Sequence, residues 1–380
     1  MKKLFSLALI LGALALTSCG ASSDKGSPNE DNQEDRTPIT YAVQPEFATG
    51  ESRDESIPLY EIHTDVQKDF LNDETLNLDN RADGKEEKSF PQKYEIKLNG
   101  EEKNYFELSL NENFEDSEIF ETSASSIKLE NLFIASKYYY RTATSLENLA
   151  TAEIKAFQTS FMAPRNVRVD GVTNFRDLGG WVTVDGKRTK QGLIYRCGRF
   201  NTSGTKEINK EITEEGEKAL IETLKMKTEV DLRNNKYDET GGLDGTSSVV
   251  EELEYKWFPF QVISIEDNKG VLKEIFDCLS DQSNYPLCFH CNIGTDRTGM
   301  ISMLYNGVLG VPFDSCIFDY AFSNFGLIGG RRTATMIRDT KFINEIKAYN
   351  GETFKDKCEA ALLDIGVTST QIENIRNLML

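Results

Sequence analysis

The spacing of apolar residues along the chain changes partway through. Between about residues 39 and 162, apolar residues alternate with polar ones in short runs, for example residues 94–98 (YEIKL) and 105–110 (YFELSL). Alternation with a period of two is typical of strands with one buried face. After residue 166, short apolar runs alternate with longer stretches of helical spacing. We therefore predict an all-β domain over residues 39–162, followed by an α/β domain over residues 166–380.

Two further signals refine the prediction for residues 39–162. Asn99-Gly100 separates the two alternating runs, and this dipeptide favours a β-hairpin between them. Tyr138 follows Leu132 by six residues and opens another alternating run. That stretch resembles the tyrosine corner of fibronectin type III modules. The resemblance implies a small β-sandwich of the fibronectin type III kind.

In residues 166–380 the predicted elements follow the order strand, helix, strand, loop, strand, helix, strand, loop and helix. This order predicts a mainly parallel central sheet flanked by helices. The first helix is expected to begin after Thr213, a good N-cap residue, and to run to about Met226. Functional loops lie at the carboxyl ends of parallel strands. The loop after the last strand is therefore the expected place for a functional site.

That loop, residues 290–299, reads HCNIGTDRTG between an apolar strand-like run (285–289) and an apolar helix-like run (300–309). Such a loop forms a cradle for anions, because unpaired backbone N–H groups and the positive end of the helix dipole converge there. His290 is expected to brace the cradle by hydrogen bonding. The other predicted cradle positions are Asn292, Ile293, Gly294, Thr295 and Gly299.

Four residues of the loop carry the chemistry of phosphoryl transfer. Cys291 lies among N–H donors, which favour a thiolate, and a thiolate can take a phosphoryl group covalently. Arg297 offers a rigid fork of donors matched to two phosphoryl oxygens. Asp296 is placed to protonate the departing oxygen and later to activate water, and Thr298 to donate its hydroxyl to the sulfur. This chemistry requires no metal and no other cofactor.

The pattern H-C-x-x-G-x-D-R-T-G resembles the signature loop of the cysteine-dependent protein tyrosine phosphatases. Its form is most similar to the atypical bacterial tyrosine/serine phosphatases of the secreted mycobacterial type. Residues 172–180 (VTNFRDLGG), 192–198 (GLIYRCG) and 228–233 (TEVDLR) agree, and the resemblance covers about residues 166–380. It implies a cysteine-phosphatase fold and hydrolysis of phosphomonoesters through a phosphocysteine, with Asp296 as the acid. It also implies supporting roles for Arg176, Asp177, Asp231 and Arg233.

The substrate class remains open. Thr295 stands where this family often has a lysine that is associated with activity on phosphoinositides. The loss of that cation weakens the case for highly phosphorylated lipid headgroups. The resemblance makes phosphotyrosine-containing proteins the leading substrates of a tyrosine/serine phosphatase, while inositol phosphates, phosphoinositides and small phosphoesters remain alternatives. Positive charge could instead come from Arg331, Arg332 and Arg338, which otherwise form a solvated helix face. A surface lipoprotein that binds phosphorylated ligands without catalysis is the alternative from another class. Asp267 is a minor alternative for the acid.

Charge and the N-terminus decide partners and location. The chain has 43 basic and 62 acidic residues, for a net charge of −19, which argues against nucleic acid as a partner. A basic start precedes an apolar run at residues 4–16, and residues 16–20 (LTSCG) resemble a bacterial lipoprotein processing site. We therefore predict a signal peptide (1–18), a lipidated, palmitate-bearing Cys19 and a flexible tether (19–38). The mature protein would be a membrane-anchored, extracytoplasmic lipoprotein.

Histidines and the remaining cysteines limit other chemistries. With only two histidines, His63 and His290, a histidine-ligated zinc centre and a Ser-His-Asp triad lack parts. Five cysteines have no assigned role, and we expect them to be buried thiols. Cys288 lies three residues before Cys291, so a protective disulfide between the two is an alternative to a core position for Cys288. The five are Cys197, Cys278, Cys288, Cys316 and Cys358.

Overall fold

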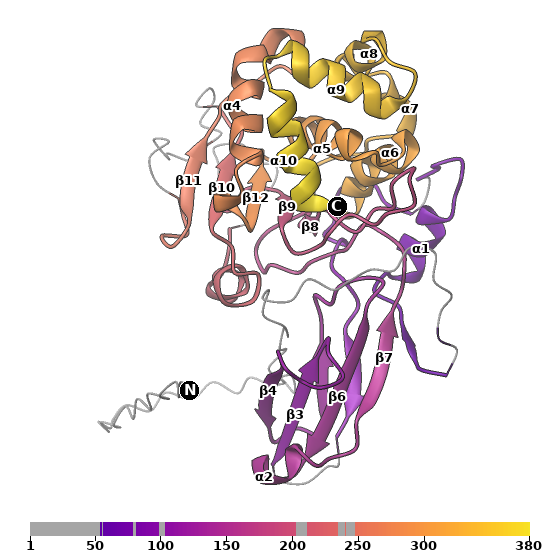
Figure 1. The fold of residues 1–380 in the computed structure, drawn as a ribbon, viewed down its shortest axis with the longest axis vertical. Helices are drawn as coiled ribbons and strands as arrows, with labels where there is room; N and C mark the ends of the chain where they lie inside the picture. Colours follow the sequence, from indigo (N-terminus) through magenta and orange to yellow (C-terminus); the bar gives the residue numbers. More distant parts are fainter. Residues whose placement is uncertain are drawn as a thin grey trace, which may run out of the picture. The chain divides into compact units, whose positions relative to one another are not determined.

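The computed structural model describes residues 54, 56–78, 81–98, 103–202, 211–234, 240 and 248–380 (Figure 1). The predicted signal peptide, Cys19 and the tether lie outside these residues. None of the helices in the described part is long and apolar enough to cross a membrane.

In the described residues between 59 and 159, seven strands form two sheets. A five-stranded sheet has the order β1-β7-β6-β3-β4, and β2 pairs with β5 in a separate antiparallel sheet. Ile96 and Leu129 from the smaller sheet share one hydrophobic cluster with Phe106 and Phe157 from the larger one. The strands are β1 (Leu59–Tyr60), β2 (Tyr94–Lys97), β3 (Asn104–Ser109), β4 (Glu118–Thr122), β5 (Ser126–Leu129), β6 (Lys137–Ala143) and β7 (Lys155–Thr159).

The predicted hairpin across Asn99-Gly100 is wrong, although that dipeptide itself lies outside the described residues. β2 pairs with β5, whereas β3 pairs with β4 and β6. The chain therefore crosses from one sheet to the other between these strands. Strands β2 and β3 both bury apolar side chains in the shared cluster, from different sheets. The buried pattern of side chains specifies which strands pair more strongly than a turn-forming dipeptide does.

The stretch that resembles a tyrosine corner has the corresponding contact. The Phe133 N–H donates a hydrogen bond to the Tyr138 hydroxyl at 2.8 Å, and Tyr138 is fully buried at the start of β6. A tyrosine hydroxyl that binds backbone a few residues upstream defines this corner. The fibronectin type III assignment stays a prediction.

Helix α1 (Asp65–Leu71) lies within the range predicted as all-β, yet it packs with the α/β part. Its N-terminus has a capping box, because Thr64 and Gln67 each bind the other's backbone N–H through a side chain. The ring of Phe70 lies 5.5 Å from that of Phe318 and 5.7 Å from that of Phe325. The sequence after β1 therefore contributes to the core of residues 166–380. A second short helix, α2 (Leu146–Leu149), precedes β7.

The second five-stranded sheet has the order β11-β10-β12-β9-β8. Four strands run parallel, and β8 pairs antiparallel with β9 at one edge. This arrangement confirms the predicted α/β class with a mainly parallel sheet. The strands are β8 (Arg176–Asp177), β9 (Ile194–Cys197), β10 (Thr228–Asp231), β11 (Glu254–Trp257) and β12 (Leu287–His290).

The first helix of this part begins as predicted and ends early. The Thr213 hydroxyl caps it by accepting a hydrogen bond from the Gly216 N–H at 3.2 Å. The α-helical segment α3 (Glu214–Lys218) continues as a π-helical turn, η1 (Ala219–Thr223), rather than extending to Met226.

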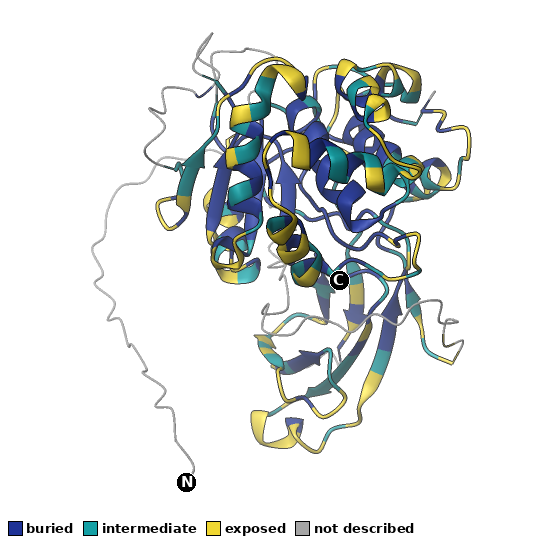
Figure 2. Ribbon diagram, turned by 45° about the horizontal axis from the view of Figure 1, so that its top comes forward, coloured by how far each residue is buried: buried dark blue, intermediate teal, exposed yellow. Residues whose placement is uncertain are grey.

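Helices cover one face of the sheet, and their inner sides are buried while their outer sides are exposed (Figure 2). Val230, Phe289 and Cys291 point into this helical layer, whereas Cys288 and Leu220 belong to a separate cluster. The helices are α4 (Lys269–Leu279), α5 (Asp296–Leu309), α6 (Phe313–Phe322), α7 (Ala334–Arg338), α8 (Lys341–Ala348), α9 (Phe354–Asp364) and α10 (Ser369–Met379). Short 3₁₀ turns are η3 (Glu266–Asn268), η4 (Gln282–Asn284) and η5 (Ser323–Phe325).

Helix α5 is the central helix of this layer. Every residue from Arg297 to Leu309 is buried, which explains why its sequence is apolar almost all round instead of amphipathic. Gly310 ends the helix in a left-handed conformation, with φ of 89°. Since β12 ends at His290 and α5 begins at Asp296, the two rigid elements fix both ends of the intervening loop.

Candidate active site

The loop between β12 and α5 has a backbone shape that its sequence requires. Gly294 has φ of +67°, and a Cβ atom there would lie 2.2 Å from the carbonyl oxygen of Cys197. No side chain fits at that distance, and positive φ strains other residue types. The glycine therefore lets the loop lie directly against the end of β9.

Cys291 is almost completely buried at the start of the loop. Burial alone would raise the pKa of its thiol. The Arg297 guanidinium and hydrogen bonds from the side chain and backbone of Thr298 outweigh that effect, so the pKa of Cys291 is lowered from its ordinary value. The structure thus brings together the predicted nucleophile, the predicted phosphate-binding arginine and the predicted hydroxyl donor.

Arg297 is held from the ends of two neighbouring strands. Its Nη1 donates to the carbonyl oxygens of Leu232 at 3.3 Å and Phe260 at 3.1 Å. Leu232 directly follows β10, and Phe260 follows β11. Because the guanidinium is planar, these bonds fix its orientation beside the thiol.

Asp296, the predicted acid, accepts hydrogen bonds at both carboxylate oxygens. The Tyr320 hydroxyl donates to Oδ1 at 2.8 Å. Arg332 reaches both oxygens, with Nε 3.2 Å from Oδ1 and Nη2 3.1 Å from Oδ2. Of the arginines considered as compensating charge, Arg332 is therefore part of the site, whereas Arg338 pairs with Asp314 at 2.7 Å.

A buried ion network supports the loop from behind. Arg196 Nη2 donates to the carbonyl oxygens of Gly294 at 2.8 Å and Thr295 at 3.3 Å. Asp319 on α6 pairs with both Arg196 and Arg176. Burial raises the pKa of Asp319, but the two arginines outweigh it and the pKa is lowered. Burial and the charge of Arg196 lower the pKa of Arg176 to about 10.

Arg176 supports the loop through Asn174. The Asn174 amide Nδ2 donates to the carbonyl oxygens of Ile293 at 3.1 Å and Gly294 at 3.0 Å. Arg176 Nη1 donates to the Asn174 Oδ1 in turn. Arg176 thus contacts the loop through Asn174, and its supporting role stays a prediction. This chain of contacts also adds Asn174, a residue that the sequence reasoning quoted only as part of a motif.

Arg199 is a further contact that the sequence reasoning missed. It is buried, and its Nη1 donates to the Asn292 side chain at 2.5 Å while its Nε donates to the carbonyl oxygen of Asn201 at 2.8 Å. Burial and the nearby Arg233 lower its pKa to about 10. Its position two residues after β9, like that of Arg196 within β9, was the available signal.

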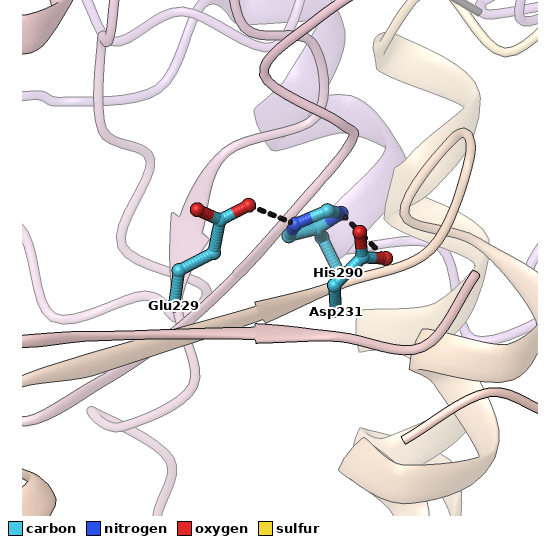
Figure 3. Close-up of side chains that lie close together, drawn as sticks. All are labelled: Glu229, Asp231 and His290. Atoms are coloured by element: carbon cyan, nitrogen blue, oxygen red, sulfur yellow. Dashed lines mark hydrogen bonds and ion pairs between the residues drawn. The ribbon is translucent and has the colours of Figure 1, made fainter. Parts of the chain in front are cut away.

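His290 lies between two buried carboxylates (Figure 3). Its Nε2 is 2.8 Å from Glu229 Oε1, and its Nδ1 is 3.8 Å from Asp231 Oδ1 and 3.2 Å from the carbonyl oxygen of Cys291. Burial alone would lower the pKa of His290, but Asp231 and Glu229 raise it to about 9. The two carboxylates therefore favour the protonated imidazole, which contacts the loop at the carbonyl oxygen of Cys291.

The same three side chains offer oxygen and nitrogen atoms close enough to surround a metal ion. A ligating histidine must be neutral, however, and the two carboxylates favour the protonated form of His290. Arg233 also binds the Asp231 carboxylate through Nε and Nη2, at 2.7–3.0 Å. The Asp231 carboxylate is thus already paired with a guanidinium, and His290 already lies between the two carboxylates.

The other supporting candidates divide into two groups. Asp231 and Arg233 pair with each other beside His290, and Arg233 also donates to the Asn201 side chain at 2.8 Å. Asp177 instead binds Arg165 at 2.8 Å and the backbone of residues 179 and 192. Arg165 in turn donates to the carbonyl oxygen of Asn131. The contacts of Asp177 therefore join the segment before β8 to the loop after β5, not to the candidate site.

The structure places the residues of two alternatives that the sequence left open. Cys288 points to the opposite side of β12 from Cys291, into the cluster that contains Cys197, and burial raises its pKa well above the ordinary value. A core position, not a disulfide with Cys291, fits this placement. Asp267 is half-exposed on η3 and pairs with Lys341, whereas Asp296 adjoins Arg297 at the loop.

Comparison with known proteins supports the resemblance seen in the sequence. Residues 167–377 match the Tyrosine phosphatase family. A curated protein of Cupriavidus necator, named provisionally as a tyrosine-protein phosphatase, is 24% identical over 194 residues, which are 43% of this chain. The chain spans 65% of the length of that relative.

Two solved structures show a distant likeness. The core catalytic domain of the PP-IP phosphatase Siw14 from S. cerevisiae has 17% identity and a TM-score of 0.27, over 41% of this chain and 88% of that one. TpbA from P. aeruginosa has 15% identity and a TM-score of 0.28, over 47% and 89%. These scores are too low to add to the family assignment.

The family match covers more than half of the chain and contains Asn174, the loop of residues 290–299 and Tyr320. The same stretch forms the parallel sheet, the central helix and the loop that holds Cys291 and Arg297. The chain belongs to the tyrosine phosphatase family.

Proposed function

We propose that this protein hydrolyses phosphomonoesters through a phosphocysteine intermediate. The observation that carries the proposal is a buried Cys291 in the same loop as Arg297, whose positive charge lowers the pKa of the thiol. A core cysteine with no reactive role has a raised pKa, as burial produces at Cys316 and Cys358. The environment of Cys291 therefore suits a nucleophile.

The reaction divides into two displacements. In the first, the Cys291 sulfur attacks phosphorus, the bond from phosphorus to the leaving oxygen breaks, and Asp296 gives that oxygen its proton. In the second, water attacks phosphorus while Asp296 takes a proton from it, and the sulfur leaves as a thiolate stabilised by Thr298. Arg297 and the loop amides hold the phosphoryl oxygens throughout.

Proteins that carry phosphotyrosine are our proposed substrates, with phosphoserine as a second class. Thr295 is buried and uncharged, so this position supplies no cation for a polyphosphorylated headgroup. The overall charge of −19 also opposes large polyanions. Membership of the atypical secreted mycobacterial type, suggested by the loop pattern, is part of the same proposal.

The test is hydrolysis by the purified full-length protein, without added metal, of a phosphotyrosine peptide, a phosphoserine peptide and inositol hexakisphosphate. Cys291→Ser is the matched variant. We expect turnover of the phosphotyrosine peptide that Cys291→Ser abolishes. A preference for inositol hexakisphosphate would change the substrate class. Absence of turnover on all substrates, with inorganic phosphate still bound, would favour a phospho-ligand-binding protein.

We further propose that the mature protein is a lipoprotein anchored outside the cytoplasm through Cys19. The support is the sequence alone, since residues 1–38 lie outside the described part of the chain. A polar tether of some twenty residues would let the enzyme range roughly 25 Å from the membrane, by the estimate for flexible linkers. A fibronectin type III-like sandwich between tether and enzyme completes the proposed arrangement, supported by the Tyr138 contact.

A further inference from the structure

The loop from Gly326 to Thr333, between η5 and α7, carries Arg332 to the candidate acid. Its backbone is clamped by Asn324, a buried residue of η5. The Arg332 N–H donates to Asn324 Oδ1 at 2.7 Å, and the Asn324 Nδ2 donates to the Arg332 carbonyl oxygen at 2.9 Å. The Arg332 backbone is thus fixed by contacts of its own, separate from the contact of its side chain with the Asp296 carboxylate.

The other side of this loop is held by residues 82–89, which precede β2. Gly84 donates its N–H to the carbonyl oxygen of Asn324 at 2.9 Å. Its own carbonyl oxygen accepts from the N–H groups of Ile328 and Gly329, both at 2.8 Å. Lys88 adds a fourth backbone bond, to the carbonyl oxygen of Phe325 at 2.6 Å.

Gly84 fits this contact because it lacks a side chain. Its φ is +73°, and a Cβ atom would lie 2.6 Å from both the Gly330 carbonyl oxygen and the Ile328 Cγ1. Any other residue at position 84 must displace the loop from Gly326 to Thr333. A segment far from the loop of residues 290–299 in sequence therefore sets the position of Arg332.

We propose that Arg332 is a positioning residue for Asp296. Residues 82–89 hold Arg332 in place and are therefore needed for full activity of the catalytic site. The inference rests on the proposed function. Arg332 binds Asp296 through two nitrogens, and Tyr320 binds the same carboxylate from α6. Two-sided contact restricts the carboxylate to one orientation, and orientation decides how well an acid meets the leaving oxygen.

The readout is the dependence of rate on the leaving group. Phenyl phosphate has a more basic leaving oxygen than p-nitrophenyl phosphate, so its hydrolysis depends far more on the acid. We expect Arg332→Ala to lower kcat/KM for phenyl phosphate about tenfold more than for p-nitrophenyl phosphate, a part of the roughly 10²–10⁴-fold that acid catalysis contributes. The quantity to compare is the ratio of kcat/KM for phenyl phosphate to kcat/KM for p-nitrophenyl phosphate. Arg332→Lys should recover part of this ratio because it keeps the charge.

Gly84→Ala tests the N-terminal part of the proposal. It should lower the same ratio, and it should have no additional effect on the ratio in an Arg332→Ala or Asp296→Asn background, because all three changes act on one group. Gly186→Ala is the matched control. Gly186 also has positive φ, at +77°, but a Cβ atom there meets nothing within 4 Å, so its ratio should equal that of the wild type.

The outcomes separate the two proposals. A wild-type protein that hydrolyses neither ester would overturn the proposed function and this inference with it. Normal wild-type turnover with an unchanged ratio in both Arg332→Ala and Gly84→Ala would overturn only the inference. A third outcome is an equal loss of kcat/KM on both esters in each variant, with the two losses multiplying in the double variant. That result would show general damage to the fold and would likewise overturn the inference.

Discussion

The His290 imidazole lies 2.8 Å from the Glu229 carboxylate, and both side chains are fully buried beside the loop of residues 290–299. Its pKa is raised from 6.5 to about 9 by Asp231 and Glu229, against the effect of burial. The folded protein therefore binds a proton more tightly than the unfolded chain does. The resulting stabilisation is fully present below pH 6.5 and is lost as the pH rises toward 9.

This linkage predicts how stability depends on pH. At about 1.4 kcal/mol per pKa unit, the shift corresponds to roughly 3 kcal/mol of unfolding free energy. Urea denaturation at pH 6 and pH 9.5 should show that loss in the wild type and little of it in His290→Gln. The same pH dependence in both proteins would contradict the proposed imidazolium.

The lowered pKa of Cys291 predicts a thiol that reacts at neutral pH. The rate of alkylation by iodoacetamide should rise at a lower pH than for a free cysteine, and Arg297→Gln should move that rise to higher pH because a stabilising charge is lost. Cys291→Ser supplies the background from the remaining cysteines. An identical pH dependence in Arg297→Gln would show that the guanidinium does not stabilise the thiolate.

Asn174→Asp tests the contacts that hold the loop. Aspartate keeps an oxygen for Arg176 but replaces the amide donor with an acceptor that faces the carbonyl oxygens of Ile293 and Gly294. We expect kcat/KM to fall by about tenfold or more because the cradle is displaced, and stability to fall by roughly 1–3 kcal/mol.

Asn166→Asp is the control for this change. Asn166 is equally buried, but its amide donates to Gln67 at 3.2 Å rather than to the loop. It should lose stability while keeping most of its turnover. Equal catalytic losses in the two variants would remove the specific role given to Asn174.

Lipidation at Cys19 predicts where the protein is found. In cells that are fed labelled palmitate, the wild type and Cys291→Ser should both carry label and sediment with membranes. Cys19→Ser should carry none and leave the membrane fraction, because the lipid on Cys19 is the proposed attachment. Label retained by Cys19→Ser would refute the predicted anchor.

The α/β part could be predicted well because its signals are local. Strands β9 and β12 are short and mostly apolar, and β10 ends in the D-L-R pattern of residues 231–233. The helices between them separate parallel strands in the expected order. The loop of residues 290–299 is also contiguous, so its residue types and their spacing were visible together. Packing partners of β2 and α1 were not visible, because both are decided by cores built from distant segments.

The supporting residues of the site show the same limit. Asn174, Arg196, Arg199 and Asp319 contact the loop or one another across roughly a hundred residues of sequence or more. The position of Arg196 in β9 places it in the sheet, but it does not show that its side chain contacts the Gly294 carbonyl oxygen. Asp177 shows the opposite case. It is next to Arg176 in the sequence, yet its carboxylate binds Arg165 and does not contact the loop of residues 290–299.

The most direct test is to trap the phosphocysteine. The wild-type protein is mixed with a phosphorus-32-labelled phosphotyrosine peptide and quenched within milliseconds, and the labelled protein is digested to locate the phosphate. Our account predicts label on the peptide that contains Cys291, lost on longer incubation and absent from Cys291→Ser. Turnover of the substrate with no label on Cys291, or with label on another residue, would contradict it.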